Sequence, residues 1–239
     1  IPKHKMKWVA LSAFVGSFFP AYLFAFAETE ISSSVTAVMV SLTPLFTLLI
    51  SVIVFGGELL KKQVIGVITG FIGIIVLINN ELLSSSFSVL YVMFIVLAAF
   101  CYAVNANLLK YKLPNIPALG IVFMSFLFMF IPAFIVLFFS DFPFSDFASN
   151  PLILESIVYI IILALFGTAV AKVMYIKLLA ISTPVFSVST TYLMPVVAIF
   201  WGLLDGEEFK LTQFIGTSII LIGVYLVTKK KAPIKGASN

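Results

Sequence analysis

Long apolar stretches, separated by short polar breaks, make up almost the whole of this chain. A helix rises about 1.5 Å per residue, so about twenty apolar residues cross a hydrocarbon core of about 30 Å. Polar breaks fall at residues 79–81, 84–86 and 140–151. The pattern therefore predicts about eight transmembrane helices, at residues 8–27, 35–54, 64–78, 87–109, 118–139, 153–179, 185–204 and 211–227.

Composition agrees with a lipid environment. Of the 239 residues, 62% are hydrophobic and only 10% are charged, whereas soluble domains carry about a quarter charged residues. Apolar side chains must therefore face lipid as well as one another. We expect an all-α integral membrane protein, which excludes a soluble enzyme. The net charge is +4, but the lysines lie between apolar spans and form no single patch for nucleic acid.

The lysines predict an orientation, because short loops rich in Lys stay in the cytoplasm. With Lys3, Lys5 and Lys7 inside, eight crossings place the other Lys-rich loops and the C-terminal tail on the same side. The opposite loops carry the acidic residues, with Lys210 as the exception. We expect a multi-pass protein of the plasma (inner) membrane with both ends of this chain in the cytoplasm.

Few residues could support catalysis or metal binding. Cys101 is the only cysteine and His4 the only histidine. A disulfide within the chain, a Cys-based or His-based metal site and a Ser-His-Asp set therefore cannot be assembled. We expect no cofactor, no metal site and no enzymatic activity.

An internal repeat relates two parts of the chain, since residues 31–77 resemble residues 181–227. Gly16 and Gly167 match as well, and Pro44 and Pro195 match with one residue of slip. Four identities recur at an offset of 150 residues, namely Glu58 with Glu208, Gln63 with Gln213, Gly66 with Gly216, and Gly73 with Gly223.

The repeat pairs the first predicted helix with the sixth, the second with the seventh and the third with the eighth. An offset of five helices is odd, so equivalent helices cross the membrane in opposite directions. Inverted repeats of this kind underlie many secondary transporters. A five-helix repeat also implies that two further helices precede Ile1 and that the intact protein has ten.

Further motifs lie in the fourth and sixth predicted helices. They read Ala99-Phe100-Cys101-Tyr102-Ala103 and Phe166-Gly167-Thr168-Ala169, the second followed by Tyr175 and by Leu179-Ala180. With Pro44…Gly57-Glu58 and Pro195…Glu208, they resemble the EamA-type family of the drug/metabolite transporter superfamily. The resemblance implies a ten-helix carrier with two five-helix repeats that moves small metabolites such as amino acids. Lys172 departs from the family pattern, which usually has an uncharged residue there.

This resemblance divides the chain into four parts. Residues 1–80 correspond to the last three helices of a first repeat, and residues 81–86 to an external linker. Residues 87–229 correspond to a complete five-helix second repeat, and residues 230–239 to a cytoplasmic tail.

Polar side chains within the predicted helices are candidates for a substrate pathway. Lys172 lies about two turns from the cytoplasmic end of its helix, where a charge in lipid costs on the order of 3 kcal/mol. It either snorkels to the surface or faces a central cavity and binds an anionic group, with Tyr175 on the same face. Tyr102 and Asn105 need partners or a wet cavity. Thr191 and Tyr192 end a polar run whose hydroxyl groups either line a path or bond nearby carbonyls.

Other residues have a structural and a functional interpretation. Pro44 and Pro195 remove a backbone donor and predict either hinges or static kinks. Gly66 and Gly70 form a GxxxG pattern for close helix packing, against a helix of this chain or of a second copy, which leaves a homodimer open. Glu58 and its counterpart Glu208 either cap loops or form a gating ion pair.

The function predicted from these features is secondary transport of small metabolites, amino acids or similar amphipathic solutes, by alternating access and in the direction of export. The expected partners are a small-molecule substrate and the lipid bilayer, with no nucleic acid. The alternative is an assembly or scaffold protein of the membrane that transports nothing.

Overall fold

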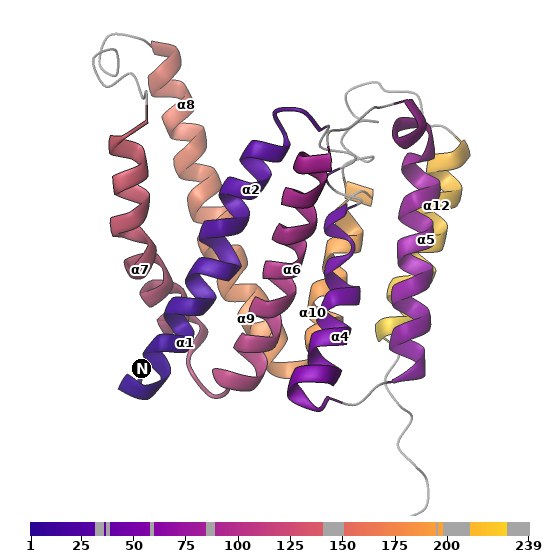
Figure 1. Ribbon diagram of the computed structural model, residues 1–239, viewed down its shortest axis with the longest axis horizontal. Helices are drawn as coiled ribbons and strands as arrows, with labels where there is room; N and C mark the ends of the chain where they lie inside the picture. Colours follow the sequence, from indigo (N-terminus) through magenta and orange to yellow (C-terminus); the bar gives the residue numbers. More distant parts are fainter. Residues whose placement is uncertain are drawn as a thin grey trace, which may run out of the picture.

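The computed structural model describes residues 1–31, 36, 39–57, 60–84, 89–140, 151–194, 196–197 and 211–228. Every regular element within these ranges is a helix, and the longest helices stand side by side across one bundle (Figure 1). The elements are α1 (Lys3–Ala13), η1 (Phe14–Phe18), α2 (Phe19–Ala27), α4 (Thr43–Phe55), α5 (Lys61–Ser84), α6 (Val89–Lys112), α7 (Ala118–Phe138), α8 (Pro151–Ile162), η3 (Leu163–Val170), α9 (Ala171–Ile181), α10 (Pro184–Val188), η4 (Ser189–Leu193) and α12 (Leu211–Thr228).

Four continuous helical segments are long and apolar enough to cross a membrane. They are Lys3–Ala27, Val89–Lys112, Ala118–Phe138 and Glu155–Ile181. Shorter apolar helices occupy Thr43–Phe55 and Phe214–Val227. The all-α class is therefore confirmed within the described residues, whereas the number of eight spans stays a prediction.

Large apolar side chains cover the outside of the bundle. Phe123 on α7 is 66% exposed and Phe139, just after this helix, is 81% exposed. In water such a surface would be strongly unfavourable, but in lipid it costs nothing because the acyl chains are equally apolar.

Helices α5 and α12 pack together at one edge of the bundle through glycines (Figure 1). A Cβ atom on Gly223 would lie 2.5 Å from the backbone nitrogen of Gly70, and one on Gly73 would lie 2.7 Å from that of Ile220. These two contacts are reciprocal at an offset of 150 residues, as across a two-fold axis. Within this chain, the GxxxG helix α5 therefore has α12 as its packing partner.

The helix that contains Pro44 begins later than the sequence indicated. The predicted span was 35–54, but a turn occupies Ser41 and Leu42, and α4 starts at Thr43. Pro44 thus lies in the first helical turn, where its missing N–H would have no partner in the helix anyway. It does not remove a hydrogen bond from the middle of a helix as expected. The hinge hypothesis for Pro44 stays a prediction, and Pro195, Glu58 and Glu208 lie outside the described residues.

Two π-helical segments interrupt the long helices at matching positions. η1 contains Gly16, η3 contains Gly167, and these glycines are the pair that the internal repeat equates. A π-helical turn holds an extra residue, changes the direction of side chains and is frequent at functional sites. Both segments face the cavity described below.

At the end of the bundle where the N-terminal lysines lie, which we call the Lys-rich end, lysines donate hydrogen bonds to carbonyl oxygens at the ends of helices. Lys5 at the start of α1 donates from Nζ to the carbonyl oxygen of Lys112 at 2.6 Å. Lys110 donates to three carbonyl oxygens at the end of α9, those of Leu179, Ala180 and Ser182, at 2.9, 3.1 and 2.5 Å. The last carbonyls of a helix have no partners within it and carry partial negative charge, so Lys110 caps α9 from a neighbouring helix.

Removing this cap should destabilise the bundle. We expect Lys110→Met to cost on the order of 1–3 kcal/mol, because three carbonyl oxygens, two of them in partly buried hydrogen bonds, lose a charged donor. The apparent Tm in detergent should fall by about 2–12 °C. Lys177→Met is the matched control, since Lys177 is exposed on α9 and makes no hydrogen bond within the described residues. An equal loss in the two variants would mean that the cap contributes nothing specific.

Candidate functional site: a polar cavity between the helices

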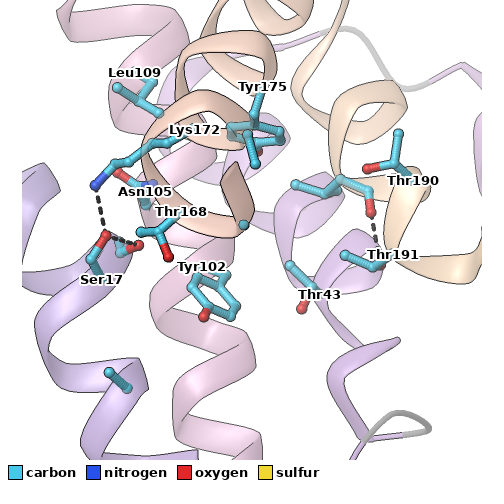
Figure 2. Close-up of a pocket in the computed structure, with 15 residues that line it drawn as sticks. Ser17, Thr43, Tyr102, Asn105, Leu109, Thr168, Lys172, Tyr175, Thr190 and Thr191 are labelled. Atoms are coloured by element: carbon cyan, nitrogen blue, oxygen red, sulfur yellow. Dashed lines mark hydrogen bonds between the residues drawn. The ribbon is translucent and has the colours of Figure 1, made fainter. Parts of the chain in front are cut away.

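A cavity of about 570 Å³ lies among helices from both parts of the chain (Figure 2). The η1–α2 segment and α4 form one part of its wall, α6 another, and η3, α9 and the α10–η4 segment the remainder. Its lining consists of Gly16, Ser17, Ala21, Thr43, Tyr102, Asn105, Leu109, Gly167, Thr168, Ala171, Lys172, Tyr175, Val188, Thr190 and Thr191.

Lys172 is the charged group of this lining. Its side chain reaches from α9 to the opposite wall, where Nζ donates to Ser17 Oγ at 2.6 Å (Figure 2). Ser17 Oγ in turn donates to the Gly16 carbonyl oxygen at 2.7 Å. The ammonium also lies 5.8 Å from the centre of the Phe126 ring. An ammonium has three N–H donors, and within the described residues no carboxylate pairs with Lys172, so donors remain for an anionic group.

Asn105 supplies an oriented amide beside this lysine. Ser12 donates to Asn105 Oδ1 at 2.5 Å, which directs the carbonyl oxygen of the amide toward α1. The Nδ2 donor makes no hydrogen bond within the described residues, and Asn105 lines the cavity. Gly16 lies directly against this amide, because a Cβ at position 16 would overlap the Asn105 side chain. A glycine in η1 therefore leaves room for a polar group on α6.

Three hydroxyl groups complete the polar wall. Tyr102, Thr168 and Tyr175 line the cavity, and their hydroxyl oxygens have no hydrogen-bond partner in the part of the chain that the structure describes. The Tyr102 ring packs against Phe24, with ring centres 5.8 Å apart. Each hydroxyl can donate or accept, so these groups can bind either end of a polar solute.

The threonines of η4 use their hydroxyl groups locally. Thr190 donates to the Ser187 carbonyl oxygen at 2.7 Å, and Thr191 donates to the Val188 carbonyl oxygen at 2.8 Å. The structure thus gives these two side chains both of the roles considered for them, since they bond nearby carbonyls and also line the cavity.

The structure brings together five of the six residues proposed for the pathway, namely Tyr102, Asn105, Lys172, Tyr175 and Thr191. The sixth, Tyr192, does not line the cavity. It is fully buried, its hydroxyl donates to the Val67 carbonyl oxygen at 3.0 Å, and its ring packs on Gly70. Tyr192 therefore joins η4 to α5.

Sequence reasoning missed Ser17 and Thr43. Serine and threonine within apolar helices commonly bond their own backbone, so neither residue distinguishes itself in the sequence. For Ser17 a signal existed, because it follows Gly16 as Thr168 follows Gly167 in the matched segment. Ser17 and Thr168 both line the cavity.

The lining favours an anionic or hydrogen-bond-accepting ligand. It contains one cation, several uncharged donors and no acidic side chain among the residues described. The described residues also contain no group of three His, Cys, Asp or Glu side chains that could hold a metal ion. A pocket of a few hundred Å³ with few polar groups in an apolar wall is typical of small-molecule sites.

Known proteins match nearly the whole chain. The model of the EamA-like transporter family matches residues 1–79 and 89–229. An uncharacterized transporter of Archaeoglobus fulgidus is 27% identical over 238 residues, which cover 95% of this chain and 81% of that protein. A solved crystal structure has the same fold, with a TM-score of 0.72 and 16% identity over 92% of this chain and 76% of the other. This chain is therefore a multi-pass membrane protein that belongs to the EamA-like transporter family.

Proposed function

We propose that this protein is a secondary transporter that moves small amphipathic metabolites, such as amino acids or related carboxylated solutes, across the plasma membrane. The observation that carries the proposal is a cavity among helices of both parts of the chain, lined by one lysine and several uncharged donors. Transport is by alternating access and in the direction of export. The function is transport, without chemical change of the solute.

Recognition of a carboxylate follows from the hydrogen-bond donors in the cavity lining. Lys172 Nζ, Asn105 Nδ2 and the Tyr102 hydroxyl can each donate to an oxygen of the solute. Bonds to a charged group are stronger than neutral ones, and the apolar surroundings strengthen them further. Apolar residues of the lining, such as Leu109 and Val188, can contact the remainder of the solute.

Alternating access is supported by the near-symmetry of the two parts. Paired π-helical segments flank the cavity, and reciprocal glycine contacts join α5 to α12. Inverted repeats that rock about a central site are the common design of secondary transporters. Gly16, Gly167 and the first turn of α4 are positions where the direction of the backbone can change.

The test is uptake and counterflow in proteoliposomes that contain the purified protein, with a panel of labelled solutes. The panel should pair each carboxylate with its amide, so that charge is the only large difference. We expect saturable uptake of carboxylated solutes and trans-stimulation by the same unlabelled solute, because a carrier exchanges across one site.

Empty vesicles and vesicles with heat-denatured protein are the controls. Flux that is unsaturable and insensitive to counterflow would contradict a carrier. Equal uptake of each acid and its amide would contradict anion recognition by the lysine while leaving transport itself intact.

A further inference from the structure

A cluster of lysines and aromatic rings lies at the Lys-rich end of the bundle, away from the cavity residues. Two ammonium groups share the ring of Trp8, since Lys7 Nζ and Lys112 Nζ lie 5.3 and 5.4 Å from its centre. Lys112 Nζ also lies 5.6 Å from the centre of the Phe55 ring. A third lysine, Lys5, is held nearby by the carbonyl oxygen of Lys112. We call Lys7, Trp8, Phe55 and Lys112 the basic–aromatic cluster.

The cluster is built from three helices and is not a loose surface patch. Trp8 comes from α1, Phe55 from the last residue of α4, and Lys112 from the last residue of α6. Phe55 stacks on Tyr111 with ring centres 4.8 Å apart and an angle of 10°, and the Tyr111 hydroxyl is 2.9 Å from Ser51 Oγ. These contacts hold the Phe55 ring in place, and the Lys112 ammonium lies over that ring.

The cluster lacks an anion. Aromatic faces attract cations but carry no net charge, so they do not neutralise two neighbouring ammonium groups. In the described part of the chain, the contacts of Lys7 and Lys112 side chains are with rings, and none is an ion pair. A ligand with a negative charge shared over several oxygens would satisfy both lysines at once.

The position of the cluster identifies the source of that anion. Trp8 stands where the charged first turn of α1 gives way to apolar residues, which is the depth at which tryptophans meet lipid headgroups. Exposed apolar side chains lie next to the cluster, on the side toward the middle of helices α1 and α4. Ile53 and Val54 next to Phe55 are 77% and 66% exposed, and Leu11 after Trp8 is 41% exposed. A phospholipid whose phosphate binds the lysines would thus have an apolar surface beside it for its acyl chains.

We infer that the basic–aromatic cluster is a binding site for the headgroup of an anionic phospholipid, with the phosphodiester held between Lys7 and Lys112 and the acyl chains along α1 and α4. Basic pockets between transmembrane helices on the side of the positive loops hold such headgroups. The site is independent of the solute cavity and of the proposed transport.

Trp8 is itself the reporter for a test. The chain has two tryptophans, so Trp201→Phe leaves Trp8 as the source of tryptophan fluorescence. Brominated phosphatidylglycerol is titrated into phosphatidylcholine vesicles, and brominated phosphatidylcholine into phosphatidylglycerol vesicles. Comparing how strongly each brominated lipid quenches Trp8 fluorescence gives the relative affinity of the two lipids for the site. We expect a preference of roughly fivefold to tenfold for phosphatidylglycerol, since each lysine near an anionic headgroup contributes a few-fold. Equal quenching by the two lipids would overturn the proposal without any further variant.

A matched pair of double variants separates the site from diffuse attraction. Lys7→Gln with Lys112→Gln should reduce the preference to about onefold to twofold. Lys61→Gln with Lys62→Gln removes the same charge from the start of α5, at the opposite edge of the bundle from α1 in Figure 1, and should leave the preference unchanged. An equal loss in both double variants would overturn a localised site. Loss of the preference on addition of inorganic phosphate, but not of chloride at the same ionic strength, would assign the cluster to free phosphate and overturn the lipid as its ligand.

Discussion

Lys172→Gln should lower kcat/KM for carboxylated solutes by about 10-fold to 100-fold in proteoliposomes. A hydrogen bond to a charged group contributes about 1.5–3 kcal/mol, and each 1.4 kcal/mol corresponds to a factor of ten. In this cavity the carboxylate would lose its one counter-charge among the described lining residues. Uptake of the matching amides should change by less than threefold, because glutamine retains a donor but no charge.

Two further variants make the result specific. Lys172→Arg keeps the charge and should retain most of the flux of carboxylates, whereas Lys177→Gln removes an exposed lysine of the same helix and should have no effect. If Lys172→Gln transports acids as well as the parent does, the lysine serves only to bond Ser17 across the bundle. A loss of acid and amide flux together, with a lower apparent Tm, would likewise indicate a structural role.

The second large effect concerns the contact between α5 and α12. We expect Gly223→Leu to lower the apparent Tm in detergent by about 6–12 °C, or to prevent folding. A Cβ at Gly223 would lie 2.5 and 2.7 Å from the backbone nitrogen and Cα of Gly70, and backbone atoms cannot rotate away as a side chain can. Overpacking costs about 1–3 kcal/mol where side chains can yield, so a cost of about 3 kcal/mol or more is expected here. Each kcal/mol lowers the Tm by about 2–4 °C in a chain of this length.

Thermal unfolding followed by size-exclusion chromatography measures this effect. Gly120→Leu on α7 is the control, since the nearest atom to a Cβ there belongs to Ile1 at 3.9 Å. Gly73→Leu tests the reciprocal contact, since a Cβ there would lie 2.7 Å from the backbone nitrogen of Ile220 on α12. If Gly223→Leu is no less stable than Gly120→Leu, the helices do not pack at this distance.

Within the described residues, the apolar pattern predicted several helices closely but not all of their ends. Predicted residues 118–139 and 211–227 agree with α7 and α12 to within a residue, because charges or turns bound them on both sides. By contrast, α5 continues through Asn79 and Asn80 to Ser84, beyond the predicted 64–78. Hydropathy reports where a helix leaves lipid, whereas backbone hydrogen bonds can continue into the polar region.

The site was predictable where polarity in lipid is expensive. Lys172 and Asn105 stood out because an unpaired charge or amide at membrane depth is unfavourable. Small hydroxyl groups such as Ser17 carry no such penalty, since they bond their own helix. Tyr192 lies outside the lining because consecutive residues of a helix point in different directions, and in the 3₁₀ segment η4 it points toward α5 and away from the cavity that its neighbour Thr191 lines. Sequence periodicity alone does not reveal a local change from α to 3₁₀ geometry.

The reciprocal glycine contacts relate two similar halves that are not identical, so a charge can lie on one wall of this cavity without a copy on the other. In a dimer of identical chains, every residue on one wall recurs on the other, so a cavity lysine would always face its own copy. Here Lys172 corresponds, at the offset of 151 that relates Gly16 to Gly167, to Ala21, and both residues line the cavity. Joining two similar halves in one chain lets each wall change alone. A membrane protein can thereby acquire a polar ligand site with a head and a tail, which strict symmetry would forbid.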